Sequence, residues 1–289
     1  LGAIQLQQIT PVLIQNFYNQ RYESGRTDGK GGLSAKTIRN LHNMLHQAFE
    51  QAKINGMILH NPTDNAVIPK QTKKEMRVLS VEEQNRLLQF IHLHRLGFAI
   101  LFDLATGLRI GELCALKWSD VNFNKQTIKI SRTLQRIKKS IGEKVSEGGN
   151  TAILEGNVKT NSGFREIPVP DNVFSMLMQH KAIQEQEKIC YAGIYQDNGY
   201  IFAMPMGTCV EPHTMRDALN YLLAAAGIEH ANFHALRHTF ATRAIENGVN
   251  VKTLSDILGH SQVQITMDLY CHTSLDLMRD SMNKLAELF

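Results

Sequence analysis

The chain has 289 residues, of which 43% are hydrophobic, so its length allows one or two folded domains with packed cores. The sequence contains no apolar run close to the roughly 20 residues that span a bilayer, and no signal peptide opens it, which argues against a membrane protein. Its four cysteines are scattered without metal-ligand spacing, which favours reduced thiols in the cytoplasm.

The net charge of +4 is unevenly distributed along the chain. Residues 1–78 contain 10 Lys and Arg against 5 Asp and Glu, whereas the remainder contains 21 against 22. This excess of positive charge fits a polyanionic partner or a solvated basic surface. The chain begins at Leu1 without a Met, and we expect part of the natural N-terminus to be absent.

Residues 1–69 predict a small helical unit. Thr10 and Pro11 are typical of a helix start, and the apolar residues that follow recur at helical spacing. A Gly-rich polar break precedes a second helix, which we expect to be capped by Ser34. Residues 70–78 are basic and almost free of apolar side chains, and they predict an interdomain linker.

A second domain is predicted over residues 79–289. Ser80 and Glu83 have the spacing of a capping box, and residues 95–105 are apolar nearly all round, which predicts a buried helix. Gly107 is expected to end that helix, and Arg109 to begin the next. An Arg at the positive end of a helix is explained by a bound anion or by a simple surface pair with Glu112.

The middle of the chain predicts β-structure. Residues 126–134 alternate like a strand, residues 136–150 suggest a long loop, and strand character resumes near residue 153. The turn signal at 160–163 predicts a hairpin with Lys159 at its tip. Such a Lys is either solvated or able to reach into a site.

The C-terminal third predicts helices over 171–190 and 212–226, followed by the stretch from His234 to Tyr270. His234, Arg237 and His238 share one face of a predicted helix by their spacing. His260 follows a helix-ending Gly, and Tyr270 lies near the end of the next helix. We expect His238 to be a packed or solvated residue. Residues 274–288 predict an amphipathic helix that folds back on its own chain or docks on a neighbouring copy.

These residue types suit chemistry on a phosphodiester. Two Arg can neutralise its oxygens with bidentate geometry, a Lys or His can protonate a leaving oxygen, and a Tyr can attack if nearby positive charge favours its phenolate. The sequence places no carboxylate cluster for Mg²⁺ near these residues and no Gly-rich phosphate loop. We therefore expect a reaction without metal or cofactor.

Four segments resemble the signature boxes of tyrosine recombinases, the phage integrase family, in order and spacing: ATGLRIGELCALKWSDV, KTNSGFREIPV, HALRHTFATRAIENG and LGHSQVQITMDLYCH. The resemblance is closest to integrases of conjugative transposons, here in an N-terminally truncated form. It implies a mainly α fold with a small antiparallel β-sheet (α+β), in which a SAM-like helical core-binding domain and a catalytic domain form a C-shaped clamp on DNA.

The resemblance also implies a role for each residue. Arg109 and Arg237 would clamp the scissile phosphate, and Lys159 would protonate the 5′-oxygen that leaves. His234 would assist proton transfer, His260 would bind a phosphate oxygen, and Tyr270 would form a 3′-phosphotyrosine. Glu112 would support Arg109.

The implied activity is site-specific recombination that integrates and excises a mobile element in a bacterial cytoplasm, in association with the nucleoid. The partners would be double-stranded DNA at core sites, further copies of the chain (a dimer on one duplex and a tetramer in synapsis), and an excisionase. We expect DNA contacts from six basic residues: Lys36, Arg39, Lys70, Lys73, Lys74 and Arg77. A type IB topoisomerase-like enzyme and a DNA-binding regulator that no longer cleaves are the alternative functions.

Overall fold

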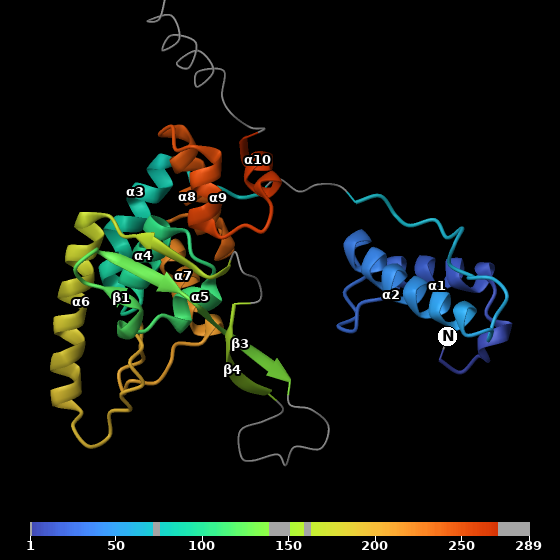
Figure 1. Ribbon diagram of the computed structural model, residues 1–289, viewed down its shortest axis with the longest axis horizontal. Helices are drawn as coiled ribbons and strands as arrows, with labels where there is room; N and C mark the ends of the chain where they lie inside the picture. The colour runs from blue at the N-terminus through green and yellow to red at the C-terminus, as the bar shows by residue number, and fades with distance from the viewer. Residues whose placement is uncertain (1, 72–75, 139–150, 159–162, 271–289) are drawn as a thin grey trace, which may run out of the picture. The chain divides into compact units, whose positions relative to one another are not determined.

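The computed structural model describes residues 2–71, 76–138, 151–158 and 163–270. The chain divides into two compact units, Leu1–Glu75 and Met76–Phe289, and the division lies inside the segment predicted as a linker. Both units are mainly helical, and the strands form two small antiparallel sheets, so the predicted fold class is confirmed (Figure 1). Among the described residues, none of the helices combines the length and apolarity needed to cross a bilayer.

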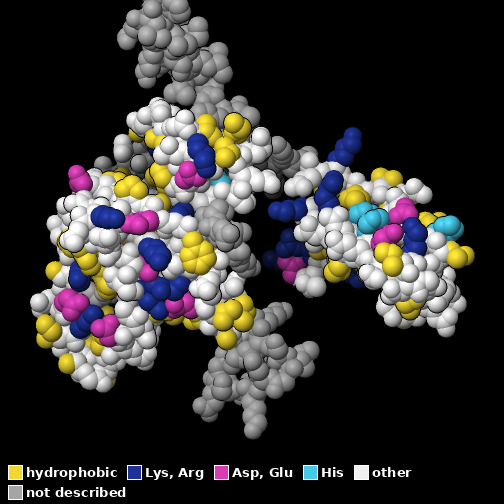
Figure 2. Space-filling view, viewed as in Figure 1, with side chains coloured by type: hydrophobic (Ala, Val, Ile, Leu, Met, Phe, Trp, Pro, Cys, Tyr) yellow, Lys and Arg dark blue, Asp and Glu magenta, His cyan; other side chains and the backbone are white. Residues whose placement is uncertain are grey.

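The N-terminal unit contains η1 (Leu6–Gln8), α1 (Pro11–Ser24) and α2 (Ala35–Ile54). The predicted caps are present, since the Thr10 and Ser34 hydroxyls accept hydrogen bonds from the third backbone N–H of their helices. Ile14, Tyr18, Ile38 and Phe49 form the centre of the core. On the outside, Figure 2 shows Lys and Arg side chains alongside hydrophobic ones.

Within its described residues, the C-terminal unit, Met76–Phe289, contains eight α-helices and two short 3₁₀ turns: α3 (Val81–Phe90), η2 (Ile91–Leu93), α4 (Gly97–Thr106), α5 (Ile110–Ala115), η3 (Trp118–Asp120), α6 (Asp171–Cys190), α7 (Pro212–Ala225), α8 (His234–Glu246), α9 (Val251–Leu258) and α10 (Val263–Tyr270). The predicted capping box of Ser80 and Glu83 begins α3. As predicted, α4 is central and buried, and it packs against α6, α7 and α8.

The strands pair in a way that the local turn signals did not predict. β1 (Val121–Asn122), β2 (Thr127–Ile130) and β5 (Arg165–Pro168) form one sheet, and β3 (Arg132–Lys138) pairs with β4 (Thr151–Asn157) in a separate two-stranded ribbon (Figure 1). The prediction of a hairpin closed at 160–163 was wrong, because β4 and β5 on either side of it pair with β3 and β2. Residues 136–138 belong to β3 and not to a loop.

Two glycines position α5, the helix that begins after Arg109. Gly107 ends α4 with φ of +62°, in the left-handed region, and turns the chain into α5. Gly111 lies against β3, where an added Cβ would come within 2.4 Å of the Thr133 hydroxyl and 2.8 Å of the Leu134 carbonyl oxygen. α8, α9 and α10 contact one another, and α9 also contacts β5 (Figure 1). The first turn of α5 is therefore fixed beside the ends of α4 and α9.

Candidate active site

Arg109 is held at the start of α5 with its guanidinium group partly open to solvent. Its backbone N–H donates to Oε2 of Glu112 at 3.1 Å, and its Nη1 donates to Oε1 of the same carboxylate at 2.7 Å. Its Nη2 donates to the carbonyl oxygen of Gly259 at 3.0 Å. The Arg109 side chain is 42% exposed, whereas that of Glu112 is 3% exposed. The expected support of Arg109 by Glu112 is confirmed.

Arg237 reaches the same place from the first turn of α8, but it is almost fully buried. Its Nη1 donates to the Gly107 carbonyl oxygen at 2.8 Å, and its Nη2 donates to the Leu258 carbonyl oxygen at 2.7 Å. These carbonyls lie at the C-terminal ends of α4 and α9, where helical carbonyls lack partners in the helix and favour a cation. Burial and then the neighbouring Arg109 lower the pKa of Arg237 to about 9, so it remains charged at neutral pH.

His260 follows directly on the end of α9 and is half-buried. Its ring Nδ1 lies 2.8 Å from the hydroxyl of Thr266, a fully buried residue of α10. Burial and the positive charge of Arg237 and Arg109 lower the pKa of His260 to about 4. The imidazole is therefore neutral at physiological pH.

His234 and His238 form an edge-to-face pair on α8, with their ring centroids 4.4 Å apart. Partial burial lowers the pKa of His234, and Arg237 and Arg109 add to this effect. For His238, burial followed by His234 lowers the pKa to about 4. The His238 ring is half-buried and lies against that of His234.

Three predicted residues lie outside the described residues: Lys159, Lys73 and Lys74. Tyr270 is the last residue of α10, and its side chain is not described. The amphipathic segment 274–288 is also outside. Among the predicted DNA contacts, Lys36, Arg39 and Lys70 are exposed, whereas Arg77 donates from Nη2 to the Glu83 carboxylate at 2.6 Å.

The structure adds two ionisable residues that the sequence reasoning missed. Arg165, at the start of β5, donates from Nη2 to Oε2 of Glu112 at 2.8 Å and from Nε to the Ile257 carbonyl oxygen at 2.6 Å. Asp103 of α4 is fully buried, and neither of its carboxylate oxygens has a hydrogen-bond partner among the described residues. Neither residue had a local pattern that marked it, because both matter through contacts made by the fold.

The electrostatic balance of this cluster favours an anion. Burial works against ionisation of Glu112, but the contacts from Arg165 and Arg109 outweigh it and lower the pKa of Glu112 below its usual range. Burial raises the pKa of Asp103 well above its usual range, an effect that Arg237 opposes and Glu112 reinforces, and so favours the uncharged acid. With Asp103 uncharged, three guanidinium groups and one carboxylate leave a surplus of two positive charges.

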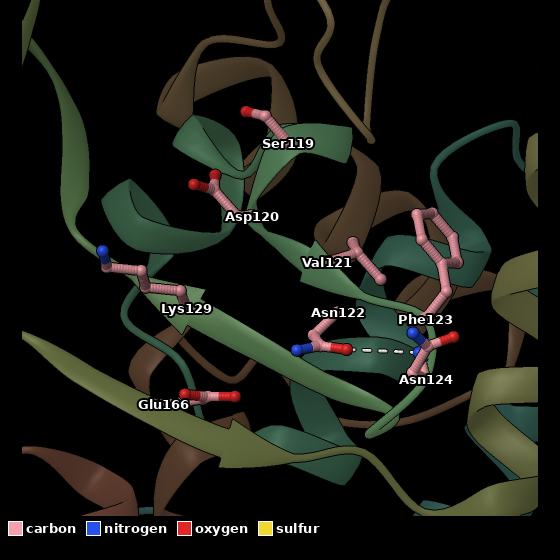
Figure 3. Close-up of a pocket in the computed structure, with 8 residues that line it drawn as sticks. All are labelled: Ser119, Asp120, Val121, Asn122, Phe123, Asn124, Lys129 and Glu166. Atoms are coloured by element: carbon pink, nitrogen blue, oxygen red, sulfur yellow. Dashed lines mark hydrogen bonds between the residues drawn. The ribbon is translucent and has the colours of Figure 1, made fainter.

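Two cavities open beside these groups. One, of about 300 Å³, is lined by Arg109, Glu112 and Gly259 together with residues of β3, and the other, of about 180 Å³, is lined by Arg165, Gly259 and His260 among others. A larger hollow of about 440 Å³ lies between η3 and strands β1, β2 and β5, with Asp120, Lys129 and Glu166 at its rim (Figure 3). None of the predicted site residues lines that hollow. The surplus positive charge lies instead at the ends of α4 and α9.

Within the ranges that the structure describes, there is no cluster of three His, Cys, Asp or Glu side chains that could hold a metal ion. Residues 77–275 match the model of the phage integrase family. The chain belongs to the phage integrase family. Members of this tyrosine recombinase family are DNA strand transferases, and the chain is an enzyme of this class.

Individual relatives of the chain carry consistent names. A tyrosine recombinase XerC-like protein of Caldanaerobacter subterraneus subsp. tengcongensis is 32% identical, over 100% of this chain and 74% of its own length. The transposase of transposon Tn916 from Enterococcus faecalis is 26% identical, over 89% of this chain and 63% of its own. A structure of the Tn1549 transposon integrase with a circular intermediate DNA matches with a TM-score of 0.75 and 26% identity, over 99% of this chain and 88% of the other.

Proposed function

We propose that this protein recombines DNA at specific sites, and so integrates and excises a mobile element through a 3′-phosphotyrosine at Tyr270. The observation that carries the proposal is the pair Arg109 and Arg237, whose guanidinium groups are anchored on the adjacent carbonyls of Gly259 and Leu258. Two guanidinium groups fixed side by side suit the two non-bridging oxygens of one phosphodiester.

In the proposed reaction, the Tyr270 phenolate oxygen attacks the phosphorus in line with the 5′-oxygen. The new phosphorus–phenol oxygen bond forms as the bond to the 5′-oxygen breaks, and Lys159 gives that oxygen its proton. A 5′-hydroxyl of the partner strand then attacks the phosphotyrosine and releases Tyr270. The number of phosphodiester bonds is unchanged, so no energy source is needed.

The histidines take supporting roles in this proposal. His260 is neutral, and when its Nδ1 accepts from the Thr266 hydroxyl, its proton lies on Nε2, which can then donate to a phosphate oxygen. Thr266 precedes Tyr270 by one helical turn on α10, so the same helix orients His260 and carries the nucleophile. His234, beside the two arginines, would assist proton transfer.

We further propose that the two units close as a C-shaped clamp on duplex DNA, with phosphate contacts from the basic residues predicted above. The domain limits 1–69, 70–78 and 79–289 belong to this proposal. So does a dimer on one duplex that becomes a tetramer in synapsis, with 274–288 docking on a neighbour. The Tn1549 transposon integrase was solved on circular intermediate DNA, and λ integrase, 20% identical with a TM-score of 0.62, was solved as a tetramer on a Holliday junction. An excisionase and association with a bacterial nucleoid complete the proposal.

A nicked duplex that carries the element's core site tests the chemistry. Cleavage near the nick releases a short fragment and traps the covalent protein–DNA adduct, which we expect from the native chain and from a Tyr191→Phe control but not from Tyr270→Phe. An adduct formed by Tyr270→Phe would refute the assignment of the nucleophile. Transfer of a labelled strand between two duplexes would separate recombination from the topoisomerase-like alternative.

A further inference from the structure

The C-terminal end of α9 gathers three arginines from three different parts of the chain. The carbonyl oxygens of three consecutive residues, Ile257, Leu258 and Gly259, accept hydrogen bonds from Arg165, Arg237 and Arg109 respectively. These carbonyls belong to the last turn of a helix, which has no helical N–H groups left to satisfy them and carries partial negative charge. The helix end therefore fixes the spacing of the three guanidinium groups.

Arg165 differs from Arg109 in what its guanidinium group faces. The Arg165 side chain is only 6% exposed, and its nitrogen atoms donate to Ile257, to the Gly163 carbonyl oxygen at 3.3 Å, and to both oxygens of Glu112. Its donors are thus directed at protein acceptors. Arg165 borders only the smaller cavity, whereas Arg109 is 42% exposed beside the larger of the two. Arg165 is placed to hold protein groups and not to bind the phosphate itself.

The Glu112 carboxylate joins the two arginines. Its Oε1 accepts from Nη1 of Arg109 and its Oε2 accepts from Nη2 of Arg165. A buried carboxylate needs close and well-directed partners to offset its loss of hydration, so its position depends on both. If Arg165 moved, Glu112 would shift and carry Arg109 with it. At the same time α9 would lose the contact at Ile257, one residue before the carbonyl that anchors Arg237.

We propose that Arg165 is a positioning residue for the transesterification. It holds Glu112 and the end of α9 in fixed relative positions and thereby places Arg109 and Arg237 on the phosphate. This inference rests on the proposed function. A Lys at 165 keeps the charge but has no planar fork with which to bridge a carboxylate and a carbonyl oxygen. Arg165→Lys should therefore weaken the positioning of Glu112 and of the end of α9 without changing the net charge of the site.

The test compares Arg165→Lys with a matched control on two forms of the nicked duplex. Arg95→Lys is the control, because Arg95 also joins a carboxylate, Glu187, to a backbone carbonyl, that of Ala203, but does so away from the site. One duplex has a normal scissile phosphate, and the other has a methylphosphonate, which lacks one charged non-bridging oxygen. Single-turnover adduct formation at saturating protein gives the rate constant, and its concentration dependence gives the apparent affinity.

We expect Arg165→Lys to lower the rate constant on the normal phosphate by about tenfold to a hundredfold, as a misplacement near 1 Å does. The apparent affinity should be unchanged, and the loss should shrink on the methylphosphonate, where correct placement of both arginines matters less. Arg95→Lys should keep the native rate on both duplexes. Arg165→Gln, which keeps a donor for Glu112, is the second variant if the Lys variant melts below the assay temperature.

An equal fold-loss on the two duplexes, or a smaller active fraction with a native rate constant, would overturn the inference and leave Arg165 a purely structural residue. Such a result would leave the proposed function intact, because the native chain would still form the Tyr270-dependent adduct. If the native chain forms no adduct on its core site, the proposed function fails, and this inference fails with it.

Discussion

Gly107 is a position where one added methyl group tests how tightly the arginine site is packed. Its φ is +62°, and its carbonyl oxygen accepts the hydrogen bond from Nη1 of Arg237. A Cβ built on Gly107 would come within 2.4 Å of Cδ1 of Phe240 and 2.9 Å of Cδ2 of Leu258. Gly227 has nearly the same backbone, with φ of +63°, but a Cβ there would meet nothing within 4 Å. The two glycines separate backbone strain from crowding.

Both Ala variants carry the left-handed penalty of about 1–2 kcal/mol for a residue with a Cβ. Gly107→Ala must also displace the Phe240 ring and a Leu258 methyl group, and overpacking of this kind costs about 1–3 kcal/mol more. We therefore expect Gly107→Ala to lower the free energy of unfolding by about 1–3 kcal/mol more than Gly227→Ala. In a unit of this size, each kcal/mol corresponds to about 2–4 °C in Tm.

Urea unfolding followed by tryptophan fluorescence measures this difference. Trp118 is the single Trp of the chain and lies in the C-terminal unit, Met76–Phe289, where its Nε1 donates to the Gln184 side chain, so the signal reports on that unit alone. Gly107→Ala should also slow adduct formation, because its carbonyl anchors Arg237, whereas Gly227→Ala should not. Equal losses of stability in the two variants would refute the packing argument.

Three further changes have expected outcomes. Ser80→Ala removes the capping box of α3 and should cost about 0.5–2 kcal/mol in the same urea assay; an unchanged midpoint would contradict the cap. Burial raises the pKa of Asp103 in the folded chain, so the native chain loses stability as the pH rises from the ordinary pKa of Asp towards the raised pKa. Asp103→Asn should therefore be more stable than the native chain at pH 8, by a margin that shrinks towards pH 4. Unfolding at several pH values checks this, and a margin independent of pH would contradict it. Because the pKa of His260 is about 4, His260→Gln should lower the adduct rate by a constant factor from pH 5.5 to 8, and a pH-dependent factor would show that His260 titrates in this range.

The helix boundaries of this chain were predictable because their signals are local. Ser34 and Ser80 cap the helices that they were expected to cap, and Gly107 and Gly259 end theirs in the left-handed conformation. In each case the hydrogen bonds that begin or end the helix involve residues within about one turn. The local sequence was therefore enough to predict where these helices begin and end.

The strand pairing was not predictable in the same way. The turn signal at 160–163 predicted that the strands on either side would pair with each other, but β5 pairs with β2 instead. In that register Ile167 lies opposite Ile128, and both are buried, whereas Ile153 and Leu154 of β4 are well exposed. The pairing is explained by which apolar side chains the core can cover, and a four-residue turn pattern carries no information on that.

The site was predictable only in part for a related reason. Arg109 and Glu112 are one turn apart, so their contact could be read from spacing. Arg165 looked like one polar residue of an alternating strand, and its partners Glu112 and Ile257 lie 53 residues before it and 92 residues after it. The residue that joins the clamp to the end of α9 is visible only when the fold brings these segments together.

Anchoring the arginines on carbonyl oxygens has a consequence for anion binding. Phosphate sites at helix N-termini use backbone N–H groups directly, whereas here carbonyl oxygens at the C-terminal ends of α4 and α9 hold the guanidinium groups of Arg237 and Arg109, of which Arg109 lines a cavity. A carbonyl oxygen orients a guanidinium group without cancelling its charge, but a carboxylate in its place would compete with the phosphate. Glu112 is shared between Arg109 and Arg165, and burial favours the uncharged form of Asp103.

The free protein therefore keeps its surplus positive charge, and burial with mutual repulsion makes that charge costly, as the lowered pKa of Arg237 indicates. An arriving phosphodiester relieves that cost, and the relief is greatest in the pentavalent state, where the charge on the oxygens is highest.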